Sequence, residues 1–85
     1  MSGFRFGLSA RFVAMPIDAI LEVLTYANGN ACPVRIVLRD GTEVIGTPSS
    51  VDTHPTAYEV FLHPTGDADT EIAVSIAAIV SAEMI

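Results

Sequence analysis

The sequence predicts a mostly β fold in which an N-terminal helix precedes a strongly bent, five-stranded barrel. Apolar and polar residues alternate on both sides of Asp40-Gly41, with the period of two that a half-buried strand requires. One apolar stripe at helical spacing comes before these strands, and no second helical stripe follows them. The 85 residues suit one domain, predicted over residues 15–85, after an N-terminal arm at residues 1–14.

The composition is unusually apolar for a chain of this length. Hydrophobic residues make up 51% of the chain, and the mean hydropathy is +0.50. No apolar run approaches the roughly 20 residues that a membrane-spanning helix needs, so no membrane association is predicted. We therefore expect apolar area to be buried between subunits. Cys32 is the single cysteine and the N-terminus lacks an uninterrupted apolar region, which together predict a reducing, cytoplasmic location.

The charge balance is acidic. Ten acidic residues face four arginines and no lysine, which gives a formal net charge of −6. Non-specific binding to phosphates needs a basic surface, so this mode of nucleic-acid binding is excluded. Any polynucleotide site has to be local and to depend on stacking and base edges.

Two interpretations of the arm remain open. It interleaves arginine and aromatic residues with Gly and Ser, namely Phe4, Arg5, Phe6, Arg11 and Phe12. Such a segment can stack on bases and contact phosphates. The alternative, which we favour, is a partly ordered terminus whose Phe residues pack on the domain or on a neighbour.

A helix is predicted over Pro16–Ala27. Pro16 suits its first position, and Asp18 in the first turn favours the helix dipole. The apolar stripe at i, i+3, i+4 and i+7 consists of Ile17, Ile20, Leu21 and Leu24. Asn28-Gly29-Asn30 supplies residues that accept the left-handed conformation at a helix end. We expect this helix to cover an open end of the sheet.

The strands follow in close succession. Val34, Ile36 and Leu38 should face the core, and Asp40-Gly41 predicts a two-residue turn in which both residues have φ > 0. Pro48 and Pro55 should interrupt regular pairing. The other expected segments are a loop or broken strand end at Thr47–Thr56, a third strand at Ala57–His63, an acidic turn at Pro64–Thr70, a fourth strand at Glu71–Ile76 and a fifth at Ile79–Met84.

This order of parts resembles the Sm/LSm-like family. PIDAILEVL followed by PVRIVLRDGTEVIGTP is similar to the opening of these proteins. Gly41 matches the turn of the family's first motif, Gly46 the bend, and Val51-Asp52 the apolar-Asp pair. His54 matches the position that stacks on a base, whereas Thr56 stands where the family usually has Asn. The resemblance covers roughly Pro16 to Leu62.

The family's second motif is poorly matched. Between its last two strands the family usually carries an Arg-Gly or Lys-His pair, and here VSIAAIV places Ser75 or a neighbour in the cationic position. The resemblance implies an Sm-like (SH3-type) barrel that assembles into a homo-oligomeric ring of five to eight subunits. It also implies binding of single-stranded nucleic acid, RNA more than DNA, and a role in RNA or DNA processing. The implied site consists of Asp52, His54, Thr56 and Ser75.

Physical arguments explain why the chain should form a ring, and they offer a second interpretation of the implied site. A bent sheet leaves unpaired edges, which copies of the chain can complete head to tail. The outward apolar side chains that we expect at such contacts are Val37, Ile45, Phe61 and Ile79. The alternative for Asp52 and His54 is a loop held by local Asp and Thr hydrogen bonds.

Enzyme motifs are lacking. The sequence has no Ser-His-Asp order, no GxSxG, no Gly-rich phosphate loop and no HExxH, so we predict neither an enzyme nor a cofactor. His-Pro occurs twice, at His54-Pro55 and His63-Pro64, near carboxylates, but without the spacing of a metal site. Two functions stay open: a ring that binds single-stranded nucleic acid, and a structural or assembly ring that binds proteins alone.

Overall fold

The computed structural model describes residues 14–85, and the rest of the predicted arm lies outside the described residues. One helix comes first and five strands follow, so the predicted order of helix and strands is confirmed. The elements are α1 (Ile17–Asn30), β2 (Val34–Leu38), β3 (Glu43–Asp52), β4 (Glu59–Pro64), β5 (Ile72–Ser75), the 3₁₀ turn η1 (Ile76–Ala78) and β6 (Ile79–Met84).

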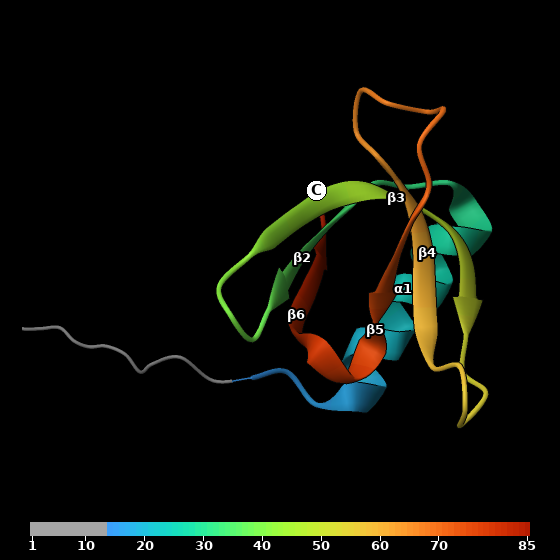
Figure 1. Ribbon diagram of the computed structural model, residues 1–85. Coiled ribbons are helices and arrows are strands. Elements are labelled where there is room, and N and C mark those ends of the chain that lie inside the picture. The colour runs from blue at the N-terminus through green and yellow to red at the C-terminus, as the bar shows by residue number, and fades with distance from the viewer. Residues whose placement is uncertain (1–13) are drawn as a thin grey trace, which may run out of the picture.

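All five strands belong to one antiparallel sheet with the order β5-β4-β3-β2-β6. The sheet curves strongly along β3, but it is not closed, because β5 and β6 are its two edges (Figure 1). The predicted barrel is therefore an open, bent sheet in this structure. Helix α1 packs against β3 and β6 and covers the inner face of the sheet.

Helix α1 runs further than the sequence indicates. It passes through Asn28-Gly29-Asn30 and ends at Asn30, so the prediction that this tripeptide terminates the helix is wrong. The left-handed residue is Ala31, with φ of 54°. The Asn30 side-chain amide donates to the Tyr26 carbonyl oxygen at 2.9 Å, which gives a carbonyl of the last turn a partner.

The buried face of α1 is shifted from the predicted stripe. Ile20, Leu24 and Ala27 are fully buried, at spacings of four and three residues. Ile17 is 41% exposed, and Leu21 is only partly buried. The core that this face closes contains Val34, Ile36, Val60, Leu62, Val74, Ile76, Ile79 and Ala82.

The turn between β2 and β3 is a three-residue turn. Gly41 has φ of 88°, whereas Asp40 does not have positive φ, so the predicted two-residue turn is wrong. The Gly41 N–H donates to the Leu38 carbonyl oxygen at 2.9 Å, and the Leu38 N–H donates to the Thr42 carbonyl oxygen. This is the pattern of a tight turn followed by a glycine bulge. Gly41 is required here because of its left-handed conformation.

Strand β3 continues to Asp52, within the segment predicted as a loop or broken strand end, and its pairing with β4 shifts in register between Pro48 and Ser50, as expected beside a proline. It pairs with β2 up to Gly46 and with β4 from Gly46 to Asp52. Pro48 is tolerated because β2 does not continue alongside this half of β3, which leaves one side of the strand free. A Cβ at Gly46 would lie 2.9 Å from Leu62 Cδ1 and nearer still to the His63 carbonyl oxygen. The bend therefore requires glycine.

A bulge changes the faces of β6. Its register with β2 shifts between Val37 and Leu38, and both Ile79 and Val80 are buried. The prediction that Ile79 faces outward is therefore wrong, whereas Ile45 is 39% exposed as expected. The predicted third and fourth strands also move slightly, to the bounds given above for β4 and β5.

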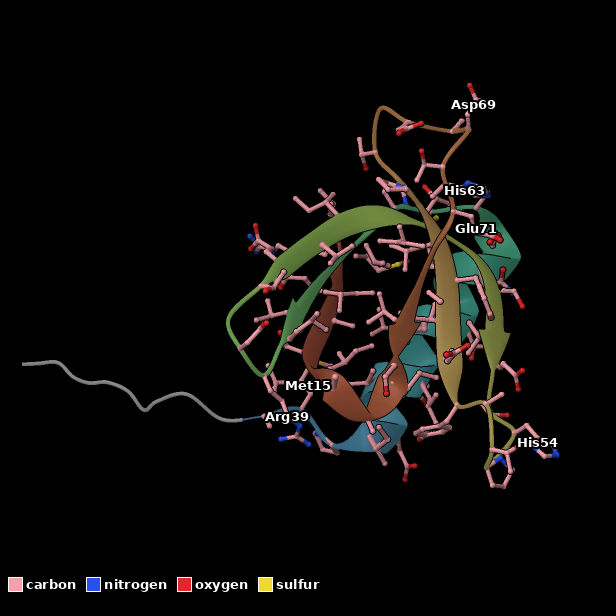
Figure 2. The ribbon with its side chains drawn as sticks, viewed as in Figure 1. Met15, Arg39, His54, His63, Asp69 and Glu71 are labelled. Atoms are coloured by element: carbon pink, nitrogen blue, oxygen red, sulfur yellow. The ribbon has the colours of Figure 1, made fainter. Side chains whose placement is uncertain are left out.

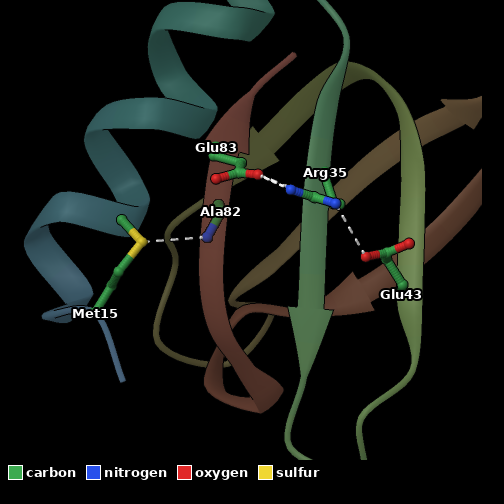
Figure 3. A network of polar contacts seen from close by, with 5 residues as sticks. All are labelled: Met15, Arg35, Glu43, Ala82 and Glu83. Carbon is green, nitrogen blue, oxygen red and sulfur yellow. Dashed lines mark hydrogen bonds and ion pairs between the residues drawn. The ribbon is translucent and has the colours of Figure 1, made fainter. Parts of the chain in front are cut away.

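Residue Met15 lies against the outer edge of β6 (Figure 3). Its N–H donates to the Val80 carbonyl oxygen at 2.8 Å, and its Sδ accepts the Ala82 N–H at 3.4 Å. On the outer face of the sheet, Arg35 joins Glu83 of β6 to Glu43 of β3. These bonds raise the pKa of Arg35, first through the hydrogen bond to Glu83.

Candidate functional site

The loop between β3 and β4 brings three of the four predicted site residues together. Asp52 Oδ1 accepts the His54 N–H at 2.9 Å, which is the local bond of an Asx turn. The N–H groups of Ala57 and Tyr58 both donate to the His54 carbonyl oxygen, at 2.9 and 2.8 Å. His54 is therefore held by its backbone while its side chain is exposed.

The His54 ring is oriented by Thr56. The Thr56 N–H donates to His54 Nδ1 at 3.3 Å, and the Thr56 hydroxyl lies 2.8 Å from the same nitrogen. A nitrogen that accepts from a backbone N–H carries no proton, so the neutral ring carries its proton on Nε2. The ring thus presents a flat face and one N–H donor. The contacts of Asp52 and Thr56 with His54 are also those expected from the alternative to a binding site, in which local hydrogen bonds only hold the loop.

Tyr58 connects this loop to η1. It has φ of 24°, which is rare for a residue with a bulky side chain. Its carbonyl oxygen accepts the Ile76 N–H at 3.1 Å. The β3–β4 loop and the β5–β6 connection consequently meet at the same end of the sheet.

Ser75 is separated from the other predicted residues by a carboxylate. Glu59 of β4 pairs with Asp52 on one side and with Ser75 on the other. Residues that oppose each other across neighbouring strands project to the same face of a sheet, so the three side chains form one row. Glu59 was not predicted as a site residue, and finding it requires the register of β3, β4 and β5.

Arg39 is the cation that sequence reasoning missed. Its Nε donates to the Ala77 carbonyl oxygen at 3.2 Å, and its N–H donates to the Ala78 carbonyl oxygen at 3.0 Å. Both acceptors belong to η1, which lies in the VSIAAIV segment. The Sm/LSm-like family usually has its own Arg or Lys in this segment, and this chain has none there. Among the described residues, the ion pairs of arginine all involve Arg35, so Arg39 keeps its charge exposed. Arg39 and His54 both lie at the lower end of the molecule in Figure 2, on opposite sides of that end.

The second His-Pro dipeptide lies at the opposite end (Figure 2). His63 Nδ1 lies 2.8 Å from the Thr70 carbonyl oxygen, and its Nε2 lies 3.8 Å from Glu71 Oε2. Ser49, the bulge residue of β3, donates to the same Glu71 oxygen at 2.7 Å. Because the two histidines are at opposite ends, they cannot bind one metal ion together. Within residues 14–85, no group of three potential ligands is arranged to hold one.

The charges are divided unequally along the chain. All ten acidic residues lie within residues 14–85, together with only Arg35 and Arg39, so the described part has a formal net charge of −8. The residues before position 14 carry Arg5 and Arg11 and no acidic residue. The field around the described domain is therefore strongly negative, and Arg39 provides a local exception.

Comparisons with known proteins add no assignment: no family model, no curated protein and no solved structure matches this chain. In the described part of the chain, α1 is too short and too polar to span a membrane.

Proposed function

We propose that the chain assembles into an Sm-like homo-oligomeric ring that binds single-stranded nucleic acid, preferably RNA. The observation that supports this most is the contact of the β3–β4 loop with η1, because it brings the exposed side chains of His54 and Arg39 to one end of the sheet, on its two sides. In the sequence these residues are 15 positions apart, and Arg39 is far from Ala77 of η1. The folding of the sheet brings Arg39 into contact with η1.

The assembly would use the two edges of the open sheet. A free edge presents unpaired N–H and C=O groups, and the strand of a second copy can satisfy them. One edge of the sheet is β5 and the other is β6, so a head-to-tail contact between them is heterologous and can close into a ring. The neighbouring strand would replace the two contacts that Met15 makes with β6, of which one is to a weak sulfur acceptor.

The chemistry proposed for the site follows from the shape of each side chain. The His54 ring would stack on an unpaired base, and its Nε2–H would donate to a base edge. Arg39 would bind a phosphate, because its guanidinium has donors beyond the one that contacts Ala77. A single stack contributes about 1–3 kcal/mol, so useful affinity depends on repeating the site around a ring.

Fluorescence anisotropy with a labelled uridine-rich or adenine-rich oligonucleotide tests this function. We expect binding at low salt that weakens as salt is raised. His54→Ala should weaken binding by at least about fivefold, because the variant ring loses one stack of about 1–3 kcal/mol in every subunit that contacts the oligonucleotide. Arg39→Gln should weaken binding for all sequences and reduce its salt dependence.

The matched control is His63→Ala, which removes the same residue type at the other end of the molecule. It should leave the affinity unchanged when circular dichroism shows that the variant is folded. Equal weakening by both histidine variants would contradict a site at His54. Lack of binding by an assembled ring at low salt would remove the function altogether.

A second candidate is an assembly ring that binds proteins and no nucleic acid. It is favoured by the row of Asp52 and Glu59, where two carboxylates share one face beside the proposed site. These carboxylates repel phosphates and suit a basic partner. Partners that remain bound to the full chain after nuclease treatment would support this candidate, whereas loss of every partner after nuclease would argue for the first.

A further inference from the structure

The outward face of α1 carries a shallow groove of about 490 Å³. It is lined by Asp18, Leu21, Glu22, Thr25 and Tyr26, which follow one another along the helix. The lining thus combines two carboxylates with the apolar Leu21 and the Tyr26 ring, and it includes no cation. Tyr26 is 57% exposed, which is high for a large side chain beside such a surface.

The apolar part of this surface extends to the start of the helix. Ile17, one turn before Leu21, is 41% exposed, although both belong to the stripe that the sequence predicts to be buried. The core uses Ile20 and Leu24 instead. Leu21 packs against the core with part of its side chain, so Ile17 and the remaining part of Leu21 are the apolar surface that the sheet leaves exposed on this side of the helix.

The residues before Ala14 have the complementary composition. They contain Arg5 and Arg11, no acidic residue, and the aromatic residues Phe4, Phe6 and Phe12. They account for half of the four basic residues in the chain. Cations that alternate with large apolar side chains match a groove whose lining mixes carboxylates with apolar side chains.

The length of this segment is also sufficient. The described chain begins at Ala14, three positions before the first residue of α1. Eight residues lie between Arg5 and Ala14, so nine Cα–Cα steps can span up to about 30 Å, whereas α1, with 14 residues, is about 21 Å long. The segment can therefore fold back along the whole groove of its own chain.

We propose that residues 4–12 dock on the outward groove of α1 in the same chain, with Arg5 and Arg11 paired to Asp18 and Glu22. The Phe side chains contact the exposed part of Leu21 and the Tyr26 ring. Such docking covers the exposed apolar surface and neutralises part of the acidic surface. It also withholds both arginines from any nucleic acid, which distinguishes the two interpretations of the arm.

Trypsin cleavage of the full chain tests this docking, because the chain has no lysine and only four arginines. Cleavage after Arg5 and Arg11 should be about two- to tenfold faster in the variant Asp18→Asn/Glu22→Gln, the range that one or two exposed ion pairs supply. The control variant is Asp67→Asn/Asp69→Asn, which removes the same charge in the β4–β5 loop. It should be cleaved at the rate of the unmodified chain.

Two outcomes would overturn the proposal. One is the same cleavage rate in the groove variant and the loop control. The other is a protection that increases with protein concentration, because the segment would then dock on a second copy. Cleavage that is slow, independent of concentration and specific to the groove carboxylates supports docking within one chain.

Amide chemical shifts provide a readout that does not depend on a protease. In the full chain, Arg5→Ala/Arg11→Ala should shift the ¹H–¹⁵N signals of Leu21, Glu22 and Tyr26 and leave those of the β4–β5 loop in place. Unchanged groove signals would contradict the docking even if the cleavage rates differ.

Discussion

The two His-Pro dipeptides have the same sequence and opposite surroundings. His54 lies in an exposed loop, and its ring is fixed by Thr56, two residues away. His63 is half-buried on β4, and its ring reaches Thr70 across the β4–β5 loop and lies near Glu71, which directly precedes β5. A histidine held by its nearest neighbours is available to a ligand, whereas one whose partners lie on the far side of a loop helps to hold the fold.

The two rings also carry their protons on different nitrogens. His54 Nδ1 accepts a backbone N–H, so its proton is on Nε2. His63 Nδ1 lies 2.8 Å from a carbonyl oxygen and therefore has to be the donor. The exposed ring thus offers its donor outward, while the half-buried ring uses its donor internally.

The largest effect on stability is expected at Gly46, whose Cα lies against the backbone of His63. Gly46→Ala places a Cβ against the His63 carbonyl oxygen, which cannot move without breaking the pairing of β3 with β4. We expect a loss of about 3 kcal/mol in the free energy of unfolding, measured by urea denaturation. The control Gly29→Ala meets open space in α1 and should stabilise the chain by about 0.5–1 kcal/mol. Equal effects of the two substitutions would contradict the bend at Gly46.

A smaller effect on stability is expected for His63→Ala, and a still smaller one for His54→Ala. His63→Ala removes a hydrogen bond from a half-buried group and should lower the free energy of unfolding by about 1 kcal/mol. His54→Ala removes contacts that are confined to an exposed loop and should change it by less than about 0.5 kcal/mol. Urea denaturation of both variants under the same conditions measures the difference. A larger loss for His54→Ala would reverse the roles assigned to the two residues.

The smallest effect concerns the turn at Asp40, which has the same local bond as Asp52. Its Oδ1 accepts the Thr42 N–H at 2.8 Å, and bonds from the Thr42 hydroxyl and N–H hold the pKa of Asp40 below its usual 3.8. A lowered pKa stabilises the fold above pH 3.8, and this contribution disappears as the pH falls through the folded-state value. Asp40→Asn keeps an acceptor but does not titrate.

Thermal unfolding at several pH values measures this contribution. The unmodified chain should unfold at a higher temperature than Asp40→Asn at pH 7, and the difference should shrink as the pH falls well below 3.8. A difference that is constant with pH would show that the charge of Asp40 makes no contribution.

Sequence patterns predicted the parts that depend on local periodicity. The β2–β3 hairpin, the burial of Ile20 and Leu24, and the order of one helix and five strands are all confirmed. Patterns failed where the outcome depends on neighbouring strands. Regular pairing shifts directly after Pro48 as expected, but β3 continues past it because β2 does not continue beside this half of the strand. A register shift between β2 and β6 buries Ile79.

The candidate site shows the same division. Asp52, His54 and Thr56 come together because they are close in the sequence, so local rules are sufficient to group them. Arg39 belongs to the site because it contacts η1, and Glu59 because the register of β3, β4 and β5 places it between Asp52 and Ser75. Neither relation can be seen in a local sequence pattern.

Sedimentation equilibrium of the full chain at micromolar concentration tests the ring directly. If copies of the chain complete the edges β5 and β6, the mass should be between five and eight multiples of the 9.0 kDa chain. A mass of 9.0 kDa at every concentration would mean that both edges stay unpaired, and it would contradict the proposed ring.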